Sequence, residues 1–467
     1  MNSWILPHRR IPTIALGLLL GVAIAVLVAC SQGQREKAAQ PTAPVPLQIY
    51  WNRGFYPAED QALQQVIDDW EQQSQVPVKL SLFSSDDILN QTTIALDKGT
   101  PPDIVFAHRA DYTITPRWAA EGKLADVSEV ITPVKDQYTE TALASAYLNN
   151  QKKKNLGYYA VPIEQQMLHV HYWRDLLNQA GFTDADIPSD WSGFWQFWQQ
   201  VQDRLRQQGN NEVYGLGIPV SSKAGDSFFI FEQILEANHV ALFDAQGKLQ
   251  LREPRVKQGL IDAIAWLTQL YQQGYVPLDA TNWLDSDNNV KFLNQNFVMT
   301  LNPSLSIPAS QREETDLYTQ KIATRGLPNN PDGQPPRYLV SIKQALVFDG
   351  TANLQAAKDF LTYLIQPERL NTYIKSSLGR WFPVTPNALK DAYWKDSTDP
   401  HLTVAIQQFQ QKTRPFYQVQ HPPYAQVQAE NVWGQALGWV IQDKQSPEAA
   451  VDRAIARIEQ IFAEWGN

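Results

Sequence analysis

Apolar and polar residues alternate along this chain with two periods, one typical of strands and one typical of helices. Residues 76–82 alternate strictly, which predicts a strand, and residues 63–70 carry apolar side chains at i, i+3, i+4 and i+7, which predicts a helix. The other elements predicted in this part are strands at 47–51 and 104–107 and a helix over 86–98 that ends at Gly99. The order strand–helix–strand–helix–strand predicts a parallel sheet, in which ligands bind beyond the carboxyl ends of the strands.

A second alternation of strands and helices begins after Pro162. A strand at 168–172 leads into a helix that stops at Gly181, and a final helix starts with Ser446 as its N-cap and Pro447 in its first turn. The helices predicted between them cover 191–201, 256–273, 355–365, 367–375 and 426–440. A chain of 467 residues exceeds one ordinary core, so the pattern predicts two α/β lobes.

The first 29 residues have the features of an export signal. Arg9 and Arg10 precede an uncharged apolar run from Ile14 to Val28, which is shorter than the ~20 residues that span a bilayer. The run ends in Leu-Val-Ala-Cys30, which resembles the lipobox of bacterial lipoproteins, whose cysteine is acylated and becomes the first mature residue. An uncleaved membrane anchor with a chance cysteine is the alternative. Residues 30–46 are polar and rich in proline and alanine, which predicts a flexible tether.

Composition narrows the class of protein. Lys+Arg 39 against Asp+Glu 48 gives a net charge of −9, and removal of residues 1–29 leaves 37 − 48 = −11, which argues against a nucleic-acid partner. One cysteine excludes a disulfide framework and any site built from several cysteines. The chain has 15 Trp, 18 Tyr and 18 Phe, so aromatic rings are available for a ligand site.

Seven segments, in order along the chain, resemble family 1 extracellular solute-binding proteins, the capture components of carbohydrate-importing ABC transporters. They are Gly99–Val105, Glu121–Val127, Tyr158–Pro162 with His171–Leu176, Phe182–Trp191, Phe292–Met299, Ala356–Leu361 and Gly379–Val384. Two positions depart from the family pattern: Trp173 replaces an asparagine, and Arg337-Tyr338-Leu339 replaces a Gly-Gly pair. The second departure suggests a different loop facing the substrate.

The resemblance implies a two-lobed α/β fold of the type II periplasmic binding protein class, with a ligand cleft and about three hinge crossings. The crossings are expected near 158–163, 297–302 and 340–346. The expected bounds are 45–160 plus 301–341 for lobe one and 163–298 plus 345–467 for lobe two. Closure of the lobes would trap the ligand for delivery to the permease.

A sugar offers apolar C–H faces and a rim of hydroxyls, so its site needs aromatic rings and hydrogen-bonding side chains. Maltose-type members of the family place a charged pair after the first motif and a carboxylate after the hinge, which correspond here to Arg109, Asp111 and Glu164. The ends of the predicted strands add Trp51, Asn52, Phe83, Ser84 and His108. Lobe two and the crossings add Trp283, Asn302, Trp381 and Trp433. For each tryptophan, a core-packing role is the alternative.

The resemblance further implies a lipid-anchored monomer outside the cytoplasm, attached through Cys30, with an ABC permease and a cytoplasmic ATPase as partners. No motif for an enzyme, a metal or another cofactor was found; His169 and His171 share one strand face but favour an ordinary structural role. Two other functions stay open. One is capture of a glycerol-phosphate ester clamped by Arg53, Arg109 and Arg337. The other is a surface glycosidase or lectin, with Asp111 and Glu164 as a carboxylate pair.

Overall fold

The computed structural model of this protein describes residues 45–85, 87–396 and 398–466. The predicted export signal at 1–29, the lipidated Cys30 and nearly all of the tether therefore lie outside the described residues. Among the helices that are described, none combines the length and the apolar character that a membrane crossing requires.

The larger sheet has seven strands in the order β12-β6-β11-β3-β1-β2, with β13 also paired to β11. β1 runs parallel to β2 and β3, as predicted, whereas β11 is antiparallel to β3 and β6. The strands are β1 (Leu47–Asn52), β2 (Val78–Phe83), β3 (Ile104–Phe106), β6 (Val161–Met167), β11 (Tyr338–Val347), β12 (Phe382–Pro383) and β13 (Thr413–Pro415).

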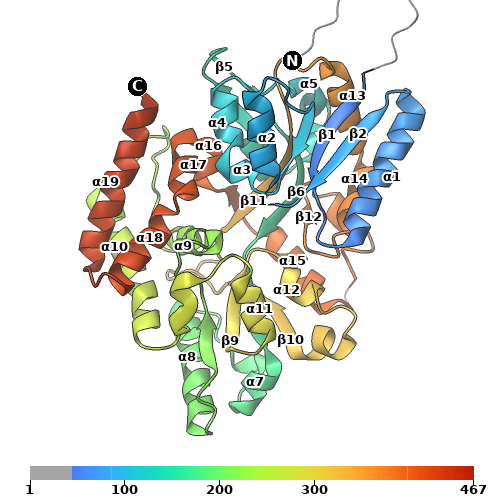
Figure 1. Cartoon of the computed structure of the whole chain (residues 1–467). Coiled ribbons are helices and arrows are strands. Elements are labelled where there is room, and N and C mark those ends of the chain that lie inside the picture. Colours follow the sequence, from blue (N-terminus) through green and yellow to red (C-terminus); the bar gives the residue numbers. More distant parts are fainter. Residues whose placement is uncertain (1–44, 86, 397, 467) are drawn as a thin grey trace, which may run out of the picture. The chain divides into compact units, whose positions relative to one another are not determined.

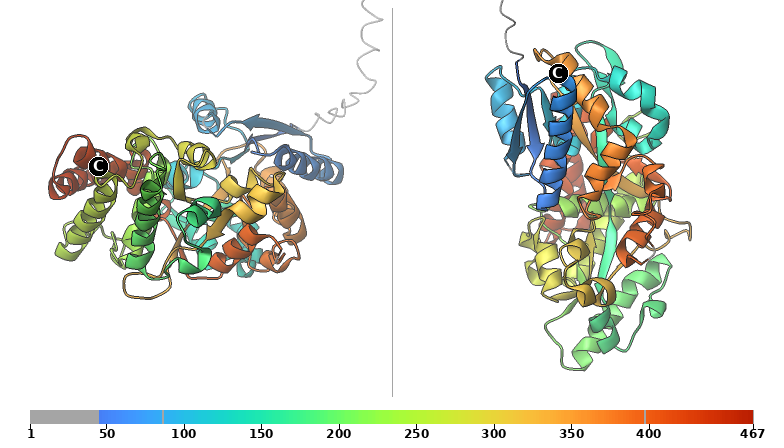
Figure 2. Two further views of the ribbon diagram at one scale, coloured as in Figure 1. Left: turned by 90° about the horizontal axis from the view of Figure 1, so that it is seen from below. Right: turned by 90° about the vertical axis from the view of Figure 1, so that its right-hand side faces the viewer.

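Helices cover both faces of this first sheet. Leu47, Ile49 and Trp51 of β1 pack into one core with α1 (Pro57–Ser74), α13 (Leu354–Leu364) and α14 (Pro367–Lys375). The other face packs against α2 (Ile88–Asp97) and α4 (Thr115–Ala120) in a second core. The right-hand view of Figure 2 shows α1 and α2 on opposite sides of β1 and β2. The apolar run at β3 is explained by this burial on both faces.

The second sheet has four strands in the order β10-β7-β9-β8. β7 is antiparallel to β9 and β10, and β8 is parallel to β9. The last residue of β8 is Gly217, and a larger residue would not fit there, since the ring of Phe297 occupies the place where a Cβ would lie. The strands are β7 (His169–Trp173), β8 (Tyr214–Gly217), β9 (Phe297–Asn302) and β10 (Ile322–Arg325).

The remaining elements surround the two sheets (Figure 1). Beside the first sheet lie α3 (Ala110–Thr113), α5 (Ser128–Ile131), α6 (Glu140–Ala146) and the hairpin β4 (Tyr147–Asn150) and β5 (Asn155–Tyr158). The helices that accompany the second sheet are α7 (Arg174–Gln179), α8 (Trp191–Gln207), α9 (Gly225–Ala237), α10 (Pro254–Gln272), α11 (Asp287–Leu293) and α12 (Ser306–Ala309). The C-terminal helices are α15 (Pro400–Phe409), α16 (Tyr417–Gln420), α17 (Pro422–Ala429), α18 (Val432–Ile441) and α19 (Pro447–Gly466).

The two sheets divide the chain differently from the predicted lobe bounds. β9 and β10 belong to the second sheet, although residues 301–341 are predicted for lobe one. β11 returns the chain to the first sheet, so α13 and α14 pack there, although 345–467 is predicted for lobe two. The late helices α16 to α19 contribute buried residues to the core of the second sheet, which agrees with that prediction.

The positions of the crossings also need correction. The chain passes between the sheets at Leu168, between β6 and β7, again between β10 and β11, and a third time after β13. The segments 297–302 and 340–346 instead lie inside single strands. The reason is that residues 161–173 form a nearly continuous buried extended run, so the apolar pattern does not reveal where the run changes sheet.

The predicted helix over 426–440 is interrupted. α17 ends before Asn431, which adopts φ 47°, and α18 begins directly after it. Asparagine tolerates this left-handed conformation, and the Asn431 Oδ1 atom accepts a hydrogen bond from the Gly434 N–H at 3.0 Å. The predicted N-cap of α19 is confirmed, because the Ala449 N–H donates to Ser446 Oγ at 3.1 Å.

Asn431→Ala is expected to lower the free energy of unfolding by about 2 kcal/mol. The substitution removes the side chain that caps α18, and it leaves at positive φ an alanine whose side chain cannot form the hydrogen bond that Asn431 makes. Urea unfolding of residues 45–467 measures this change. Asn431→Gly is the matched control, since glycine relieves the backbone strain and should lose less stability. An alanine variant as stable as the glycine variant would contradict this role.

Candidate ligand cleft

A cavity of about 230 Å³ is lined by residues from the part of the chain around the first sheet and from the part around the second sheet. The carboxyl ends of β1, β2 and β3 lead to Phe55, Ser85 and His108 in its wall, as the parallel order predicts. We call the part of the chain built on the first sheet the first lobe and the part built on the second sheet the second lobe. The first lobe also contributes to the lining Arg109, Tyr112, Gln166, Lys343, Arg380 and Trp381. The second lobe contributes Asp226, Phe229, Asp285, Ser286, Asn289, Asn302, Pro303, Ser304 and Ser306.

His108 is held in the wall by its neighbours on the sheet. Its backbone N–H donates to Asn52 Oδ1 at 2.7 Å, its Nε2 lies 3.4 Å from Glu164 Oε1, and its ring lies 4.6 Å from the ring of Trp381. Burial lowers the pKa of His108 well below its usual value, and Arg380 and Lys343 lower it further. Burial and the nearby Glu59 raise the pKa of Glu164 well above its usual value. Burial therefore favours the uncharged form of both groups.

Several buried polar atoms of this wall have no hydrogen-bond partner within the described part of the chain. Three belong to residues that line the cavity, namely His108 Nδ1, Arg380 Nη1 and Trp381 Nε1. Tyr56 Oη and Glu164 Oε1 belong to residues that do not line it. Buried polar groups in folded proteins are paired in the great majority of cases, so a cluster of unpaired ones beside a cavity is typical of a site that a ligand completes.

Arg380 is placed by two rings. Its guanidinium lies 5.1 Å from the ring centroid of Phe55 and 4.8 Å from that of Trp381, and its Nη1 lies 3.8 Å from Glu59 Oε1. Glu59 itself is fixed by the N–H groups of Phe55 and Tyr56 at 2.9 Å. The α1 N-terminus thus holds a carboxylate that offsets the charge of Arg380 at the cavity.

Lys343 and Asp111 form a buried ion pair at the base of the cleft. Lys343 Nζ lies 3.3 Å from Asp111 Oδ1 and donates to Ser341 Oγ at 2.7 Å, while Ser341 Oγ donates to Asp111 Oδ2 at 2.5 Å. Burial raises the pKa of Asp111 and lowers that of Lys343. Both side chains are 1% exposed. Lys343 lines the cavity and its Nζ lies 4.8 Å from the ring centroid of Tyr112, whereas Asp111 does not line the cavity and has a structural role as the partner of Lys343.

The second lobe contributes carboxylates and amides. Asp226 of α9 is buried and accepts a hydrogen bond from Asn288 Nδ2 at 3.3 Å, and burial together with Asp285 raises its pKa well above the usual value. At the end of β9, Asn302 Nδ2 donates to the Ser304 carbonyl at 2.7 Å. This wall therefore presents hydroxyl, amide and carboxyl groups to the cavity.

Two contacts join the walls across the cleft. Arg109 Nη2 lies 3.4 Å from Asp285 Oδ2, with side chains 39% and 41% exposed, and the rings of Tyr112 and Phe229 meet edge to face at 5.2 Å. A partly exposed ion pair contributes little stability, so this contact does little to hold the two walls together.

Of the sequence-predicted site residues, His108, Arg109, Asn302 and Trp381 line the cavity. Asn52 and Glu164 lie behind it and contact His108, and Asp111 contacts Lys343. Ser84 is adjacent to the lining Ser85, but its hydroxyl donates to Asp87 Oδ2 at 2.6 Å at the start of α2.

The other four predicted residues do not line the cavity. Trp51 stacks on Phe106 at 4.3 Å, with its Nε1 donating to Tyr373 Oη at 2.9 Å. Trp433 likewise donates to Tyr424 Oη at 2.8 Å inside the second core. Trp283 packs on Phe297 at 5.6 Å, and Phe83 packs on Tyr50 at 4.8 Å. The three tryptophans pack in the cores, which is the alternative noted for them.

Most of the second-lobe wall was not predicted. Asp226, Phe229 and Asp285 follow no motif, and they meet the first lobe only through the tertiary fold. Two first-lobe residues did carry a signal. Lys343 is the one cation in an otherwise uncharged ten-residue strand, and Arg380 directly precedes the predicted Trp381.

His169 and His171 have structural partners. His169 Nδ1 lies 2.6 Å from Gln408 Oε1, and His171 lies 2.9 Å from Thr324 Oγ1 and 3.2 Å from the Ser304 carbonyl. Within the ranges that the structure describes, no group of three or more histidine, cysteine, aspartate or glutamate side chains is arranged to hold a metal.

Known proteins resemble this chain in sequence and in fold. The family model for bacterial extracellular solute-binding proteins matches residues 65–403. YcjN of Escherichia coli (strain K12), whose name describes an ABC transporter periplasmic-binding protein, is 22% identical over 242 residues. That match covers 51% of this chain and 50% of YcjN, so the chain spans about half the length of this relative.

Solved structures share the fold at low identity. An ABC transporter solute-binding protein from Thermotoga lettingae, bound with α-D-tagatose, superposes with a TM-score of 0.72 at 17% identity, covering 89% of this chain and 99% of the other. UgpB from Mycobacterium tuberculosis, in complex with glycerophosphocholine, gives a TM-score of 0.69 at 17% identity, covering 91% of this chain and 100% of the other. These likenesses confirm the predicted two-lobed α/β fold.

His169→Gln is expected to reduce the loss of stability on mild acidification. Burial lowers the pKa of His169 to about 4, so between pH 6.5 and 4 the unfolded chain binds a proton that the folded chain does not. Stability linked to this group is therefore present above pH 6.5 and is lost as pH falls toward 4. Urea unfolding at pH 6 and pH 5 should show about 1 kcal/mol less loss in the variant than in the natural protein. An equal loss in both proteins would contradict this assignment.

Proposed function

Because the chain belongs to the bacterial extracellular solute-binding proteins, we propose that it is the substrate-binding component of an ABC importer for a small sugar or sugar-like polyol. The observation that carries the proposal is that three residues in the wall of one cavity have buried polar atoms with no hydrogen-bond partner among the described residues, namely His108 Nδ1, Arg380 Nη1 and Trp381 Nε1. A ligand with several hydroxyls supplies a donor or an acceptor to each of them.

The lining suits a polyhydroxylated solute. The rings of Phe55, Tyr112, Phe229 and Trp381 offer flat apolar surfaces for C–H faces, and the side chains of both lobes offer hydrogen-bond partners for a rim of hydroxyls. His108 lines the cavity, and in the uncharged form that burial favours its ring offers one hydrogen-bond donor and one acceptor. The volume of about 230 Å³ is below the ~300–1,000 Å³ of drug-sized ligand sites, which favours one or two sugar units over a long chain.

The charges at the cavity favour a neutral ligand over a phosphate ester. Arg109, Lys343 and Arg380 each face a carboxylate, namely Asp285, Asp111 and Glu59. Of the three arginines in the sequence-based phosphate clamp, Arg109 lines the cavity, whereas Arg337 pairs with Glu236 at 2.5 Å and Arg53 does not line the cavity. The glycerol-phosphate alternative is therefore the weaker one for this site.

The carboxylate pair expected for a glycosidase, Asp111 and Glu164, does not line the cavity. Asp111 is buried and paired with Lys343, which removes it from the cavity surface. Capture without chemical change is the function proposed, and closure of the lobes around Leu168 and the other two crossings would deliver the solute to a permease. The protein is proposed to act as a monomer.

A thermal-shift screen of residues 45–467 tests the substrate class. A ligand that binds only the folded chain raises the unfolding midpoint, so a neutral mono- or disaccharide or a polyol should raise it. Glycerophosphocholine and glycerol 3-phosphate are screened in parallel, because they test the glycerol-phosphate alternative. A midpoint raised by the phosphate compounds alone would replace the sugar proposal with the phosphate one.

Trp381→Ala is expected to weaken binding of the sugar found in that screen by about 1–3 kcal/mol, because it removes both a ring and an unpaired Nε1 donor. Isothermal titration calorimetry measures the loss. Trp381→Phe keeps a ring without the donor, so its affinity should lie between those of the natural protein and Trp381→Ala. Trp439→Ala, a half-buried tryptophan of the second lobe that does not line the cavity, is the control and should bind normally. Equal affinity in Trp381→Ala would exclude this site.

We also propose that Cys30 carries the lipid that anchors the protein outside the cytoplasm, as the lipobox resemblance implies. The full chain expressed in a bacterium should incorporate labelled palmitate and stay in the membrane fraction after a high-salt wash. Cys30→Ser should lose the label. Labelling of the Cys30→Ser chain would contradict the assignment, because the sequence has one cysteine.

A further inference from the structure

Three tryptophans meet away from the ligand cleft, in the second lobe. Trp191 and Trp195 of α8 lie 5.7 Å apart, and Trp266 of α10 lies 6.2 Å from Trp191 and 5.0 Å from Trp195. Trp191 and Trp266 are only partly buried, with one side packed on the core of the second sheet. None of the three lines the ligand cleft.

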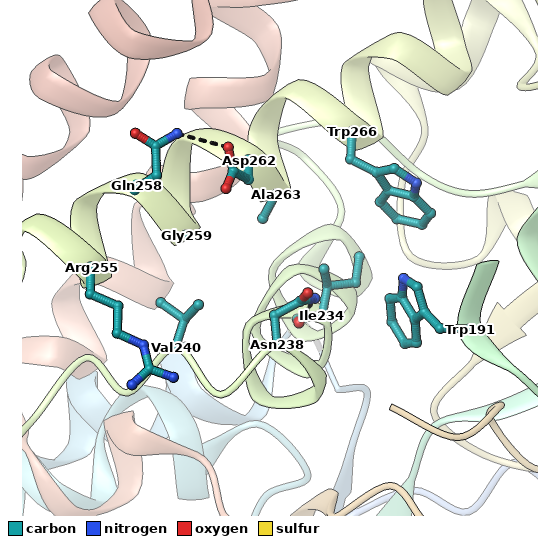
Figure 3. Close-up of a pocket in the computed structure, with 10 residues that line it drawn as sticks. All are labelled: Trp191, Ile234, Asn238, Val240, Arg255, Gln258, Gly259, Asp262, Ala263 and Trp266. Carbon is teal, nitrogen blue, oxygen red and sulfur yellow. Dashed lines mark hydrogen bonds between the residues drawn. The ribbon is translucent and has the colours of Figure 1, made fainter. Parts of the chain in front are cut away.

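Two hollows lie on either side of this tryptophan cluster. One has a volume of about 610 Å³ and is shown in Figure 3, where the rings of Trp191 and Trp266 lie at one end and Arg255 at the other. The second, of about 370 Å³, is also lined by Trp191 and Trp266. Trp191 and Trp266 line both hollows, while α9, the loop after it and α10 supply the rest of the first hollow and α8 and α10 supply the rest of the second. We call the two hollows with their shared rings the tryptophan groove.

Uncharged amides dominate the polar lining of the tryptophan groove. The second hollow contains Ser192 and the glutamines Gln196, Gln199, Gln269 and Gln273. The first contains Asn238 and Gln258, with one cation, Arg255, and one carboxylate, Asp262. Gln258 Nε2 donates to Asp262 Oδ1 at 2.8 Å (Figure 3). The groove therefore carries little net charge, and the acidic chain around it disfavours a polyanion.

An unpaired donor adds a second, independent observation. Trp195 is 3% exposed and lines the second hollow, and its Nε1 has no hydrogen-bond partner among the described residues. Buried Trp N–H groups usually find a partner, so this donor at the wall is typical of a site that a ligand hydroxyl completes.

We propose that the tryptophan groove is a second carbohydrate site, which binds a neutral oligosaccharide or polysaccharide chain. The rings of Trp191 and Trp266 would stack on the C–H faces of consecutive sugar units, and the glutamine amides would bind their hydroxyls. Two hollows that share a ridge of rings suit a chain of several units, whereas the cleft cavity suits a small solute. The site would hold a long glycan at the protein while the cleft takes a short one.

Affinity electrophoresis of residues 45–467, one compact unit of the chain, tests this proposal. The probes are soluble starch, mixed-linkage β-glucan and xylan, each cast into a native gel. The natural chain should migrate more slowly in at least one of these gels than in a plain gel. Trp191→Ala and Trp266→Ala should each weaken that retardation at least about fivefold, as the loss of a central aromatic anchor does.

Matched variants separate this site from the cleft and from misfolding. Trp439→Ala, which also removes a half-buried ring from the second lobe, and Trp381→Ala in the cleft should both keep the retardation. Gln269→Ala with Gln273→Ala, at two exposed positions, should weaken it while leaving the unfolding midpoint unchanged. Normal migration of the natural chain in all three gels, or retardation that survives Trp191→Ala and Trp266→Ala, would overturn the proposal.

Discussion

A buried imidazole and a buried carboxyl face each other at the edge of the first sheet, and the chemistry of the cleft depends on this pair. His108 Nε2 and Glu164 Oε1 are 3.4 Å apart, and each keeps an atom without a hydrogen-bond partner among the described residues. Burial lowers the pKa of His108 and raises the pKa of Glu164, which favours the uncharged form of each group. Two neutral groups that can each donate and accept match a hydroxyl better than they match an ion.

The topology of the two sheets explains why such groups meet at a cleft. β3 and β6 lie on either side of β11 and present His108 and Glu164 at one end of the first sheet. The chain then enters the second sheet at Leu168, so the walls belong to separate cores that are joined by three passes of the chain. Rigid cores with few connections favour hinge motion over local deformation. The ion pair of Arg109 with Asp285 spans the gap and remains partly exposed to solvent.

Local patterns in the sequence predicted the elements well and the tertiary placement less well. The alternation at 76–82 and the helical stripe at 63–70 became β2 and α1, because both depend on neighbours along the chain. The sheet change at Leu168 was missed, since residues 161–173 are extended and buried on both sides of it. The predicted ring at Trp433 proved to be a core residue, and Asp226 and Asp285 were missed, because no local signal tells which side of an element faces another lobe.

Small-angle X-ray scattering of residues 45–467, with and without the sugar that stabilises the chain, tests the central claim most directly. Capture between hinged lobes predicts a smaller radius of gyration when the sugar is bound, and no such change when Trp381 is replaced by alanine. A radius that the bound sugar leaves unchanged, or sugar recovered in an altered chemical form, would contradict capture by closure.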